Sequence, residues 1–298
     1  MKKILWAISA ISILILLGIL SWRAIQIKKS FPKLNFGAKK PDFQFSEPAS
    51  FPAKVLRADT QARAVFIADI ESDYPIFEKK ADKALPIASL TKIFTSLVVL
   101  TDYNLNQVLS VPPEAVNITG SKMHLLAGEK IKIEDLVWGM LVASANDAAK
   151  TLEIRLGPEL VRKMNQLAQK LGLKKTKFVD AVGLSKENVS TARELFFAAK
   201  FAIKNPVFAK IVKTKEKDVM TVDGRVIHLK NTNRLVREKS EYWGIKTGYT
   251  EEARSCLVAG YNLKDKKIIS VVLGVDNWFE RFWETERLEG LINQKIGW

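Results

Sequence analysis

Short apolar stretches typical of β-strands lie near both ends of the chain, and longer stretches with helical spacing fill its middle. The strand pattern covers residues 62–70, 74–79, 226–229, 242–246, 255–261 and 267–275. The helical pattern covers residues 89–100, 133–142, 147–156, 158–171, 191–203 and 278–292. Thr191 and Glu194 have the spacing of a capping box. Strands that return after a helical block predict an α+β domain whose sheet draws on both ends of the chain.

The N-terminus carries a different pattern. Residues 4–22 are uncharged, follow Lys2 and Lys3, and are long enough to just cross a hydrocarbon core as a helix. A cleaved signal peptide has a shorter apolar core and a small-x-small site, which Leu20 to Arg23 do not offer. We therefore expect residues 1–29 to be an uncleaved membrane anchor, with a signal segment as the alternative. The domain would lie outside the cytoplasmic membrane.

Residues 30–55 hold several prolines among scattered lysines and phenylalanines, which is typical of a linker, although an arm packed on the domain is the alternative. Residues 56–298 are then one domain.

The charge narrows the choice of partners. The 298 residues include 47 Lys+Arg and 32 Asp+Glu, a net charge of +15. This excess favours phospholipid head groups or anionic wall polymers. The chain has no basic run interleaved with aromatic residues, so nucleic acid is not expected. His124 and His228 are the only histidines, which excludes a histidine-rich metal site, and the single Cys256 excludes an intramolecular disulfide.

Ser89 and Lys92 form a Ser-x-x-Lys motif at the start of a predicted helix. Residues i and i+3 share a helix face, so the hydroxyl and the amine can meet. A serine hydroxyl needs an adjacent base, and a buried lysine can serve as one. Alone, the motif indicates little, and an N-capped helix carrying a solvated lysine is the simpler interpretation.

Two further motifs follow in the chain. Ser144 and Asn146 form a Ser-x-Asn turn between two predicted helices, where a hydroxyl could relay a proton, although a helix cap is the simpler interpretation. Lys246, Thr247 and Gly248 end a predicted strand, where the first two could hold a carboxylate and the glycine could admit substrate backbone. A plain strand end is the alternative.

All three motifs in this order are the signature of penicillin-recognising serine enzymes. The blocks around them, residues 86–93, 120–129, 141–149, 183–192 and 246–256, resemble those of the low-molecular-weight D-alanyl-D-alanine carboxypeptidases, peptidase family S11. The resemblance runs from about residue 62 onward. It implies a β-lactamase/transpeptidase-like fold, with an antiparallel sheet flanked by helices and a helical subdomain.

By that resemblance, Ser89 is acylated, Lys92 is its base, and Ser144 and Asn146 assist proton transfer and substrate positioning. Lys246 and Thr247 hold the terminal carboxylate. Gly248 and Tyr249 complete the substrate-binding strand, and the oxyanion hole is made by the N–H groups of residues 89 and 249. The resemblance implies no metal and no cofactor. The expected partners are peptidoglycan stem peptides, β-lactams as covalent inhibitors, and the cytoplasmic membrane.

Three departures from the family pattern stand out. Ala145 replaces a usual glycine, Asp180 and Ala181 replace a frequent Asn-Pro, and Arg254 follows Ala253 where a small residue is common. The expected activity is D-Ala-D-Ala carboxypeptidase. A cross-link-cutting DD-endopeptidase is the alternative, mildly favoured because no extra C-terminal domain is recognisable. A serine β-lactamase is less expected, since no Glu-x-x-x-Asn loop stands out. We also expect Arg281 and Arg287 to be solvated and the aromatic residues of stretch 278–283 to pack the last helix.

Overall fold

The computed structural model describes residues 59–295. The predicted anchor (1–29) and linker (30–55) lie outside these residues, so both stay predictions. Within residues 59–295, no helix has both the length and the apolar character needed to cross a membrane.

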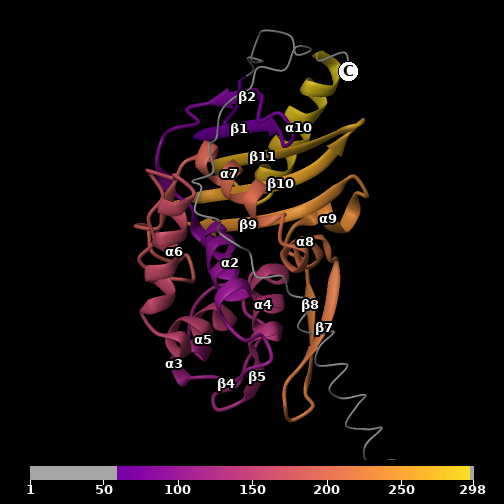
Figure 1. Ribbon diagram of the computed structural model, residues 1–298. Helices are drawn as coiled ribbons and strands as arrows, with labels where there is room; N and C mark the ends of the chain where they lie inside the picture. Colours follow the sequence, from indigo (N-terminus) through magenta and orange to yellow (C-terminus); the bar gives the residue numbers. More distant parts are fainter. Residues whose placement is uncertain (1–58, 296–298) are drawn as a thin grey trace, which may run out of the picture. The chain divides into compact units, whose positions relative to one another are not determined.

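A five-stranded antiparallel sheet forms the centre of the domain (Figure 1). Its order is β2-β1-β11-β10-β9, so the two N-terminal strands pair with the three C-terminal strands at β1 and β11, and the sheet draws on both ends of the domain as the apolar pattern predicts. The strands are β1 (Ala64–Asp69), β2 (Pro75–Lys79), β9 (Tyr242–Thr250), β10 (Arg254–Leu263) and β11 (Lys266–Val275). The predicted strand 242–246 continues to Thr250, so the Lys-Thr-Gly motif lies inside the edge strand β9 and not at its end.

Helices cover both faces of the sheet, which explains why all six residues of β1 are buried. On one face, α7 (Ala192–Ala202) contacts β1 and β11, and the rings of Phe66 and Phe196 meet edge-to-face at 5.2 Å. On the other face, α10 (Glu280–Lys295) contributes Phe282, Leu288 and Ile292 to the core. The sheet is therefore the middle layer, and β9 is its edge strand on the side of the helical block, where η1 and α8 cover it.

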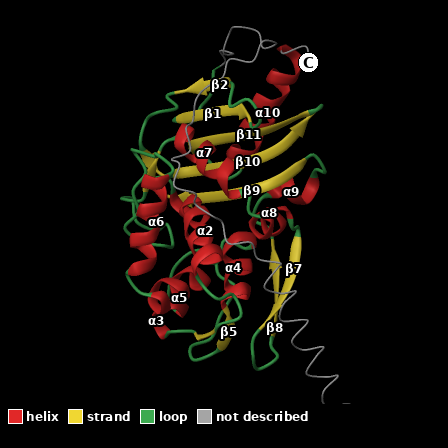
Figure 2. Ribbon diagram, in the orientation of Figure 1, coloured by secondary structure: helices red, strands yellow, loops and turns green. Residues whose placement is uncertain are grey.

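The helical block lies beyond β9 and continues the α7 side of the sheet (Figure 2). It contains a 3₁₀ turn, η1 (Ala88–Thr91), followed by α2 (Lys92–Asp102), α3 (Pro113–Val116), α4 (Ile133–Val142), α5 (Asn146–Leu156) and α6 (Glu159–Lys170). A hairpin of β4 (Val108–Ser110) and β5 (Lys130–Lys132) closes its far end. The predicted α+β fold with a helical subdomain is confirmed.

Several short elements escaped prediction. They are β3 (Leu85–Pro86), β6 (Val189–Ser190), α8 (Pro206–Lys213), β7 (Glu216–Met220) and α9 (Arg234–Glu238), together with α3, β4 and β5 of the helical block. The predicted strand 226–229 is β8 (Val226–Lys230), which pairs with β7 as a two-stranded hairpin outside the main sheet. One of the two hydrogen bonds of the predicted capping box is present. The Thr191 hydroxyl caps α7 by accepting from the Glu194 N–H, but the Glu194 carboxylate binds Lys175 and Thr176 instead of reaching back.

Candidate active site

Ser89 lies on the 3₁₀ turn η1, one residue after Ala88, whose φ is +48°. The sequence predicted Ser89 in the first turn of an α-helix, and this was wrong because α2 begins only at Lys92. The 3₁₀ turn brings the side chains of Ser89 and Lys92 together, because side chains at i and i+3 are aligned in a 3₁₀-helix. The Ser89 side chain caps neither helix, so the interpretation as a helix cap is also wrong.

The Lys92 amine is fully buried and has three acceptors, each at 2.8 Å. They are the Ser89 Oγ, the Asn146 Oδ1 and the carbonyl oxygen of Val182. The last two can only accept hydrogen bonds. A neutral amine has two N–H groups, so both are used on these acceptors and its lone pair faces the Ser89 hydroxyl. The geometry therefore favours proton transfer from Ser89 to Lys92.

The electrostatics agree with this orientation. Burial lowers the pKa of Lys92 from its ordinary value of 10.5 to about 7, although the negative charges of Asp180 and Asp147 oppose the change. When the pKa of a base lies near the working pH, a large fraction of the base is neutral and that neutral form still binds a proton well. The alternative of a solvated lysine is wrong.

Asn146 begins α5, and both ends of its side-chain amide have protein partners. The Oδ1 accepts from Lys92, and the Nδ2 donates to the carbonyl of Thr119 at 2.6 Å. Ser144 lies two residues earlier with a φ of +56° and is 5% exposed. Among the described residues, no hydrogen bond joins the Ser144 hydroxyl to Lys92. The structure thus brings Asn146 to the lysine but does not join the Ser144 hydroxyl to it.

β9 supplies the third motif. The Lys246 amine is buried, and burial together with the positive charges of Lys92 and Arg281 lowers its pKa well below the ordinary value. The Thr247 hydroxyl lies 2.7 Å from that of Thr232, a residue that sequence reasoning missed. Two buried asparagines at 231 and 233 flank Thr232, and the Asn233 side chain donates to the carbonyl of Gly244 at 2.9 Å. The Asn-x-Asn pattern of residues 231–233 was the sequence signal that could have identified Thr232 as part of the site.

Gly248 is needed for a reason that differs from the predicted one. A Cβ at this position would lie 3.2 Å from the Ser89 nitrogen and 3.1 Å from the Ile87 carbonyl oxygen. Contacts of this length are tighter than a side chain tolerates comfortably. The glycine therefore lets β9 approach the backbone of the nucleophile turn, in addition to any approach by substrate.

Arg281 was expected to be solvated, and this was wrong. It is fully buried, donates to the carbonyl of Gly248 at 2.9 Å, and lies 4.3 Å from the centre of the Trp278 ring. Its Nε and Nη2 have no hydrogen-bond partner within residues 59–295, and burial lowers its pKa to about 10. The prediction for Arg287 was nearer, since its side chain is partly exposed, although it pairs with Glu284 at 2.8 Å.

Tyr249 follows the glycine at the mouth of the site and is 39% exposed. Its ring meets that of Trp278 edge-to-face at 5.3 Å. The expectation that the aromatic residues of this stretch pack the last helix holds for Phe282 alone, because Trp278, Phe279 and Trp283 are all exposed. Cys256 is buried, as expected of a small apolar residue.

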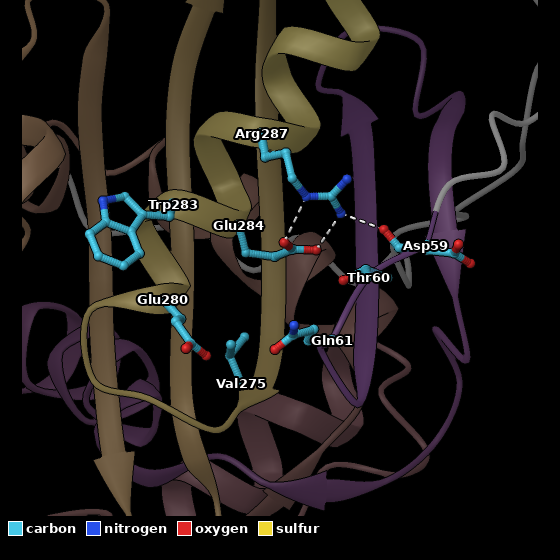
Figure 3. A pocket seen from close by; sticks show the side chains of 8 residues that line it. All are labelled: Asp59, Thr60, Gln61, Val275, Glu280, Trp283, Glu284 and Arg287. Carbon is cyan, nitrogen blue, oxygen red and sulfur yellow. Dashed lines mark hydrogen bonds and ion pairs between the residues drawn. The ribbon is translucent and has the colours of Figure 1, made fainter.

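A hollow of about 470 Å³ lies elsewhere, between α10 and the start of β1. Figure 3 shows Glu284 and Arg287 paired on one of its walls, with Glu280 and Trp283 on the preceding turn of the helix. None of the three motifs contributes to its lining, which consists of Asp59, Thr60, Gln61, Val275, Glu280, Trp283, Glu284 and Arg287. The hollow is separate from the candidate site.

Comparison with known proteins decides the family. A family model of D-alanyl-D-alanine carboxypeptidases, peptidase S11, matches residues 51–277. The chain belongs to this family. Within the S11 family, it is 30% identical over 230 residues to a D-alanyl-D-alanine carboxypeptidase of Bacillus subtilis, covering 74% of this chain and 59% of that protein. It is also 31% identical over 252 residues to a D-alanyl-D-alanine endopeptidase of Pseudomonas aeruginosa, covering 80% of this chain and 81% of that protein.

Solved structures of similar proteins share the fold. The crystal structure of the Streptomyces K15 DD-transpeptidase superimposes with a TM-score of 0.75 at 29% identity, covering 81% of this chain and all of that one. An ampicillin-bound penicillin-binding protein D2 from Listeria monocytogenes gives a TM-score of 0.69 at 32% identity, covering 79% and 98%. The predicted β-lactamase/transpeptidase-like fold of this S11 chain is confirmed.

Proposed function

We propose that this chain is a serine DD-peptidase that removes the terminal D-alanine from peptidoglycan stem peptides through an acyl-enzyme on Ser89. The observation that carries the proposal is the position of Lys92, buried and 2.8 Å from the Ser89 hydroxyl between two groups that only accept hydrogen bonds. A lysine held in this way activates a serine as a nucleophile. Membership of the S11 family supports the same conclusion.

In the proposed reaction, the Ser89 Oγ gives its proton to the Lys92 Nζ and attacks the carbonyl carbon of the penultimate D-alanine. The charge that develops on the carbonyl oxygen is stabilised by the backbone N–H groups of Ser89 and Tyr249. The C–N bond breaks as the leaving amine receives the proton by way of Ser144. A water molecule then attacks the ester carbonyl while Lys92 takes one of its protons, and the hydroxide adds to the acyl group. The C–O bond to Ser89 breaks, and Lys92 returns the proton to the Ser89 Oγ.

Lys246 and Thr247 would bind the terminal carboxylate of the peptide. Asn146 would keep the Lys92 amine in position relative to that carboxylate. The close approach of β9 to Ser89 at Gly248 supports this arrangement, because carboxylate and scissile bond are only one residue apart in the substrate. A β-lactam would enter by the same acylation step and act as a covalent inhibitor.

The uncharged stretch 4–22 supports a location at the cytoplasmic membrane, with residues 1–29 as a single-pass anchor and the catalytic domain on the extracytoplasmic side. The substrate lies there, and the net charge of +15 suits an anionic wall and membrane surface.

DD-endopeptidase activity is the second candidate, because relatives from Pseudomonas aeruginosa and Escherichia coli that carry that name match over 81% and 75% of their lengths. The test is incubation of the full-length chain and of Ser89→Ala with stem pentapeptide, cross-linked muropeptide and labelled penicillin. Release of D-alanine from the pentapeptide supports the carboxypeptidase. Cleavage of the cross-link alone supports the endopeptidase, and rapid penicillin turnover would indicate a β-lactamase. Activity that survives Ser89→Ala would contradict all three.

A further inference from the structure

A loop at residues 180–185 borders the lysine, and the side chain of Asp180 organises it. The Asp180 carboxylate accepts hydrogen bonds from the backbone N–H groups of Val182, Gly183 and Ser185. The Asn188 side chain also donates to this carboxylate and to the Asp180 carbonyl. An aspartate that bonds several following N–H groups fixes a turn that the backbone alone would leave open.

The same loop holds the lysine in place. The Val182 carbonyl accepts from the Lys92 amine at 2.8 Å, and the preceding Ala181 carbonyl accepts from the Thr95 hydroxyl at 2.7 Å. Both partners lie on α2, so the loop is fixed against that helix. Because Val182 supplies one of the two pure acceptors around the amine, the position of the loop decides whether the lone pair of a neutral Lys92 faces Ser89.

Charged groups of both signs lie around the candidate site. Asp180 on the loop and Asp147 on α5 act electrostatically on the Lys92 amine, which in turn acts, together with Arg281 on α10, on Lys246 of β9. Glu153 on α5 accepts from the backbone N–H of Ala181 in the loop. Burial pulls the pKa of Lys92 down to about 7, and Asp180 is the stronger of the two carboxylates that raise it. Asp147 and Glu153 each bind backbone N–H groups, Met123 and Leu125 for the former and Ala181 for the latter.

We propose that Asp180 is a positioning residue for the general base: it fixes the Val182 carbonyl on Lys92 and supplies the negative charge that keeps this amine able to hold a proton near neutral pH. This inference rests on the proposed function. Asp180 stands where the family pattern frequently has asparagine, which has the same shape and no charge. The chain thus carries a charge-setting residue at a position where a neutral residue suffices for the turn.

The test is the pH dependence of acylation of the full-length chain by fluorescent penicillin. Asp180→Asn keeps an acceptor for Val182 and Gly183 but removes the charge, so the midpoint of its acylation profile is expected at lower pH than that of the parent. Asp180→Glu keeps the charge and is expected to keep the parent midpoint, whatever happens to the plateau rate. Should Asp180→Asn fail to fold, Asp180→Ser provides a second neutral variant with the same expected shift.

Asn165→Ala is the matched structural control. The Asn165 side chain bonds the N–H and carbonyl of Phe178, so its loss loosens the approach to the loop without changing charge. Its plateau rate can fall, but its midpoint is expected to stay with the parent. An unshifted midpoint in both neutral variants, or an equal shift in Asn165→Ala, would overturn the inference and leave the proposed function intact. A parent that is not acylated at any pH would overturn both.

Discussion

The guanidinium of Arg281 on α10 donates a hydrogen bond of 2.9 Å to the carbonyl of Gly248. Gly248 in turn lies against the backbone of the turn that carries Ser89, so α10 helps to hold β9 at the nucleophile. Among the described residues, no carboxylate pairs with Arg281, and two of its nitrogen atoms have no hydrogen-bond partner. A buried cation in this state lowers the stability of the fold. In return, Arg281 holds β9 at Gly248 and lowers the pKa of the neighbouring Lys246.

Arg281→Met should therefore separate stability from activity. The substitution keeps much of the buried volume and removes the uncompensated charge, so Tm is expected to stay unchanged or to rise. The rate of acylation by penicillin is expected to fall by about tenfold or more, because Gly248 loses its partner and β9 its position. Thermal melting and stopped-flow acylation of the same preparation measure both. A lower Tm together with full activity would contradict the assigned role.

Gly248→Ala tests the close approach of β9 to Ser89. The new Cβ would lie 3.1 to 3.3 Å from atoms of residues 87, 88 and 89, so one of the two segments has to move by a few tenths of an ångström. Displacement at the reacting groups is expected to slow acylation by about tenfold or more while the protein stays folded.

Gly290→Ala is the matched control for that substitution, because nothing lies within 4 Å of its added Cβ on α10. It is expected to keep full activity and to stabilise the protein by about 0.5–1 kcal/mol, through better helix propensity. Equal acylation rates for both alanine variants would show that the glycine at 248 has no steric function.

The proposed base predicts the pH dependence of acylation. Lys92 acts when it is neutral, and its pKa is about 7. The rate constant should therefore rise with pH through a midpoint near neutrality and then level off. Acylation measured across acid to mildly alkaline buffers checks this. A rate that falls on raising the pH through neutrality would assign the charged form of Lys92 to the reaction instead.

The same depressed pKa predicts how stability changes with pH. Between about pH 7 and the ordinary lysine value of 10.5, the unfolded chain binds a proton at Lys92 that the folded chain does not. The free energy of unfolding should therefore rise with pH in this window, by at most about 1.4 kcal/mol per pH unit for one such group. Lys92→Met is expected to reduce the rise, leaving the part that Lys246 contributes with the same sign. Urea denaturation of the parent and the variant at several pH values measures the difference.

The motifs could be predicted because their chemistry is local in the chain. Ser89 and Lys92 are three residues apart, so helical geometry allows their side chains to meet, and the two further motifs in the same order made this interpretation specific. The strands of the main sheet were readable as well, since burial on both faces makes them continuously apolar. By contrast, β7 has one buried residue among five and shows no usable period. α8 did carry a signal, because Asn205 caps it and Pro206 is its first residue.

Arg281 shows where sequence reasoning ends. An arginine in an amphipathic helix is normally solvated. The buried Arg281 is held by the carbonyl of Gly248, 33 residues earlier, and by the Trp278 ring, and the first of these contacts depends on tertiary packing. Thr232 and Val182 are similar cases, because each matters through a contact made by tertiary packing with Thr247 and Lys92. Side-chain pattern alone does not report which carbonyl or hydroxyl will lie beside a motif.

The most direct test of the central claim is the site of covalent labelling by penicillin. The full-length chain is incubated with benzylpenicillin, digested and mapped by mass spectrometry, in parallel with Ser89→Ala and Lys92→Met. We expect one adduct per chain, located on Ser89, absent from Ser89→Ala and formed about 10² to 10⁴ times more slowly in Lys92→Met. An adduct on another residue, or labelling that persists in Ser89→Ala, would contradict the account.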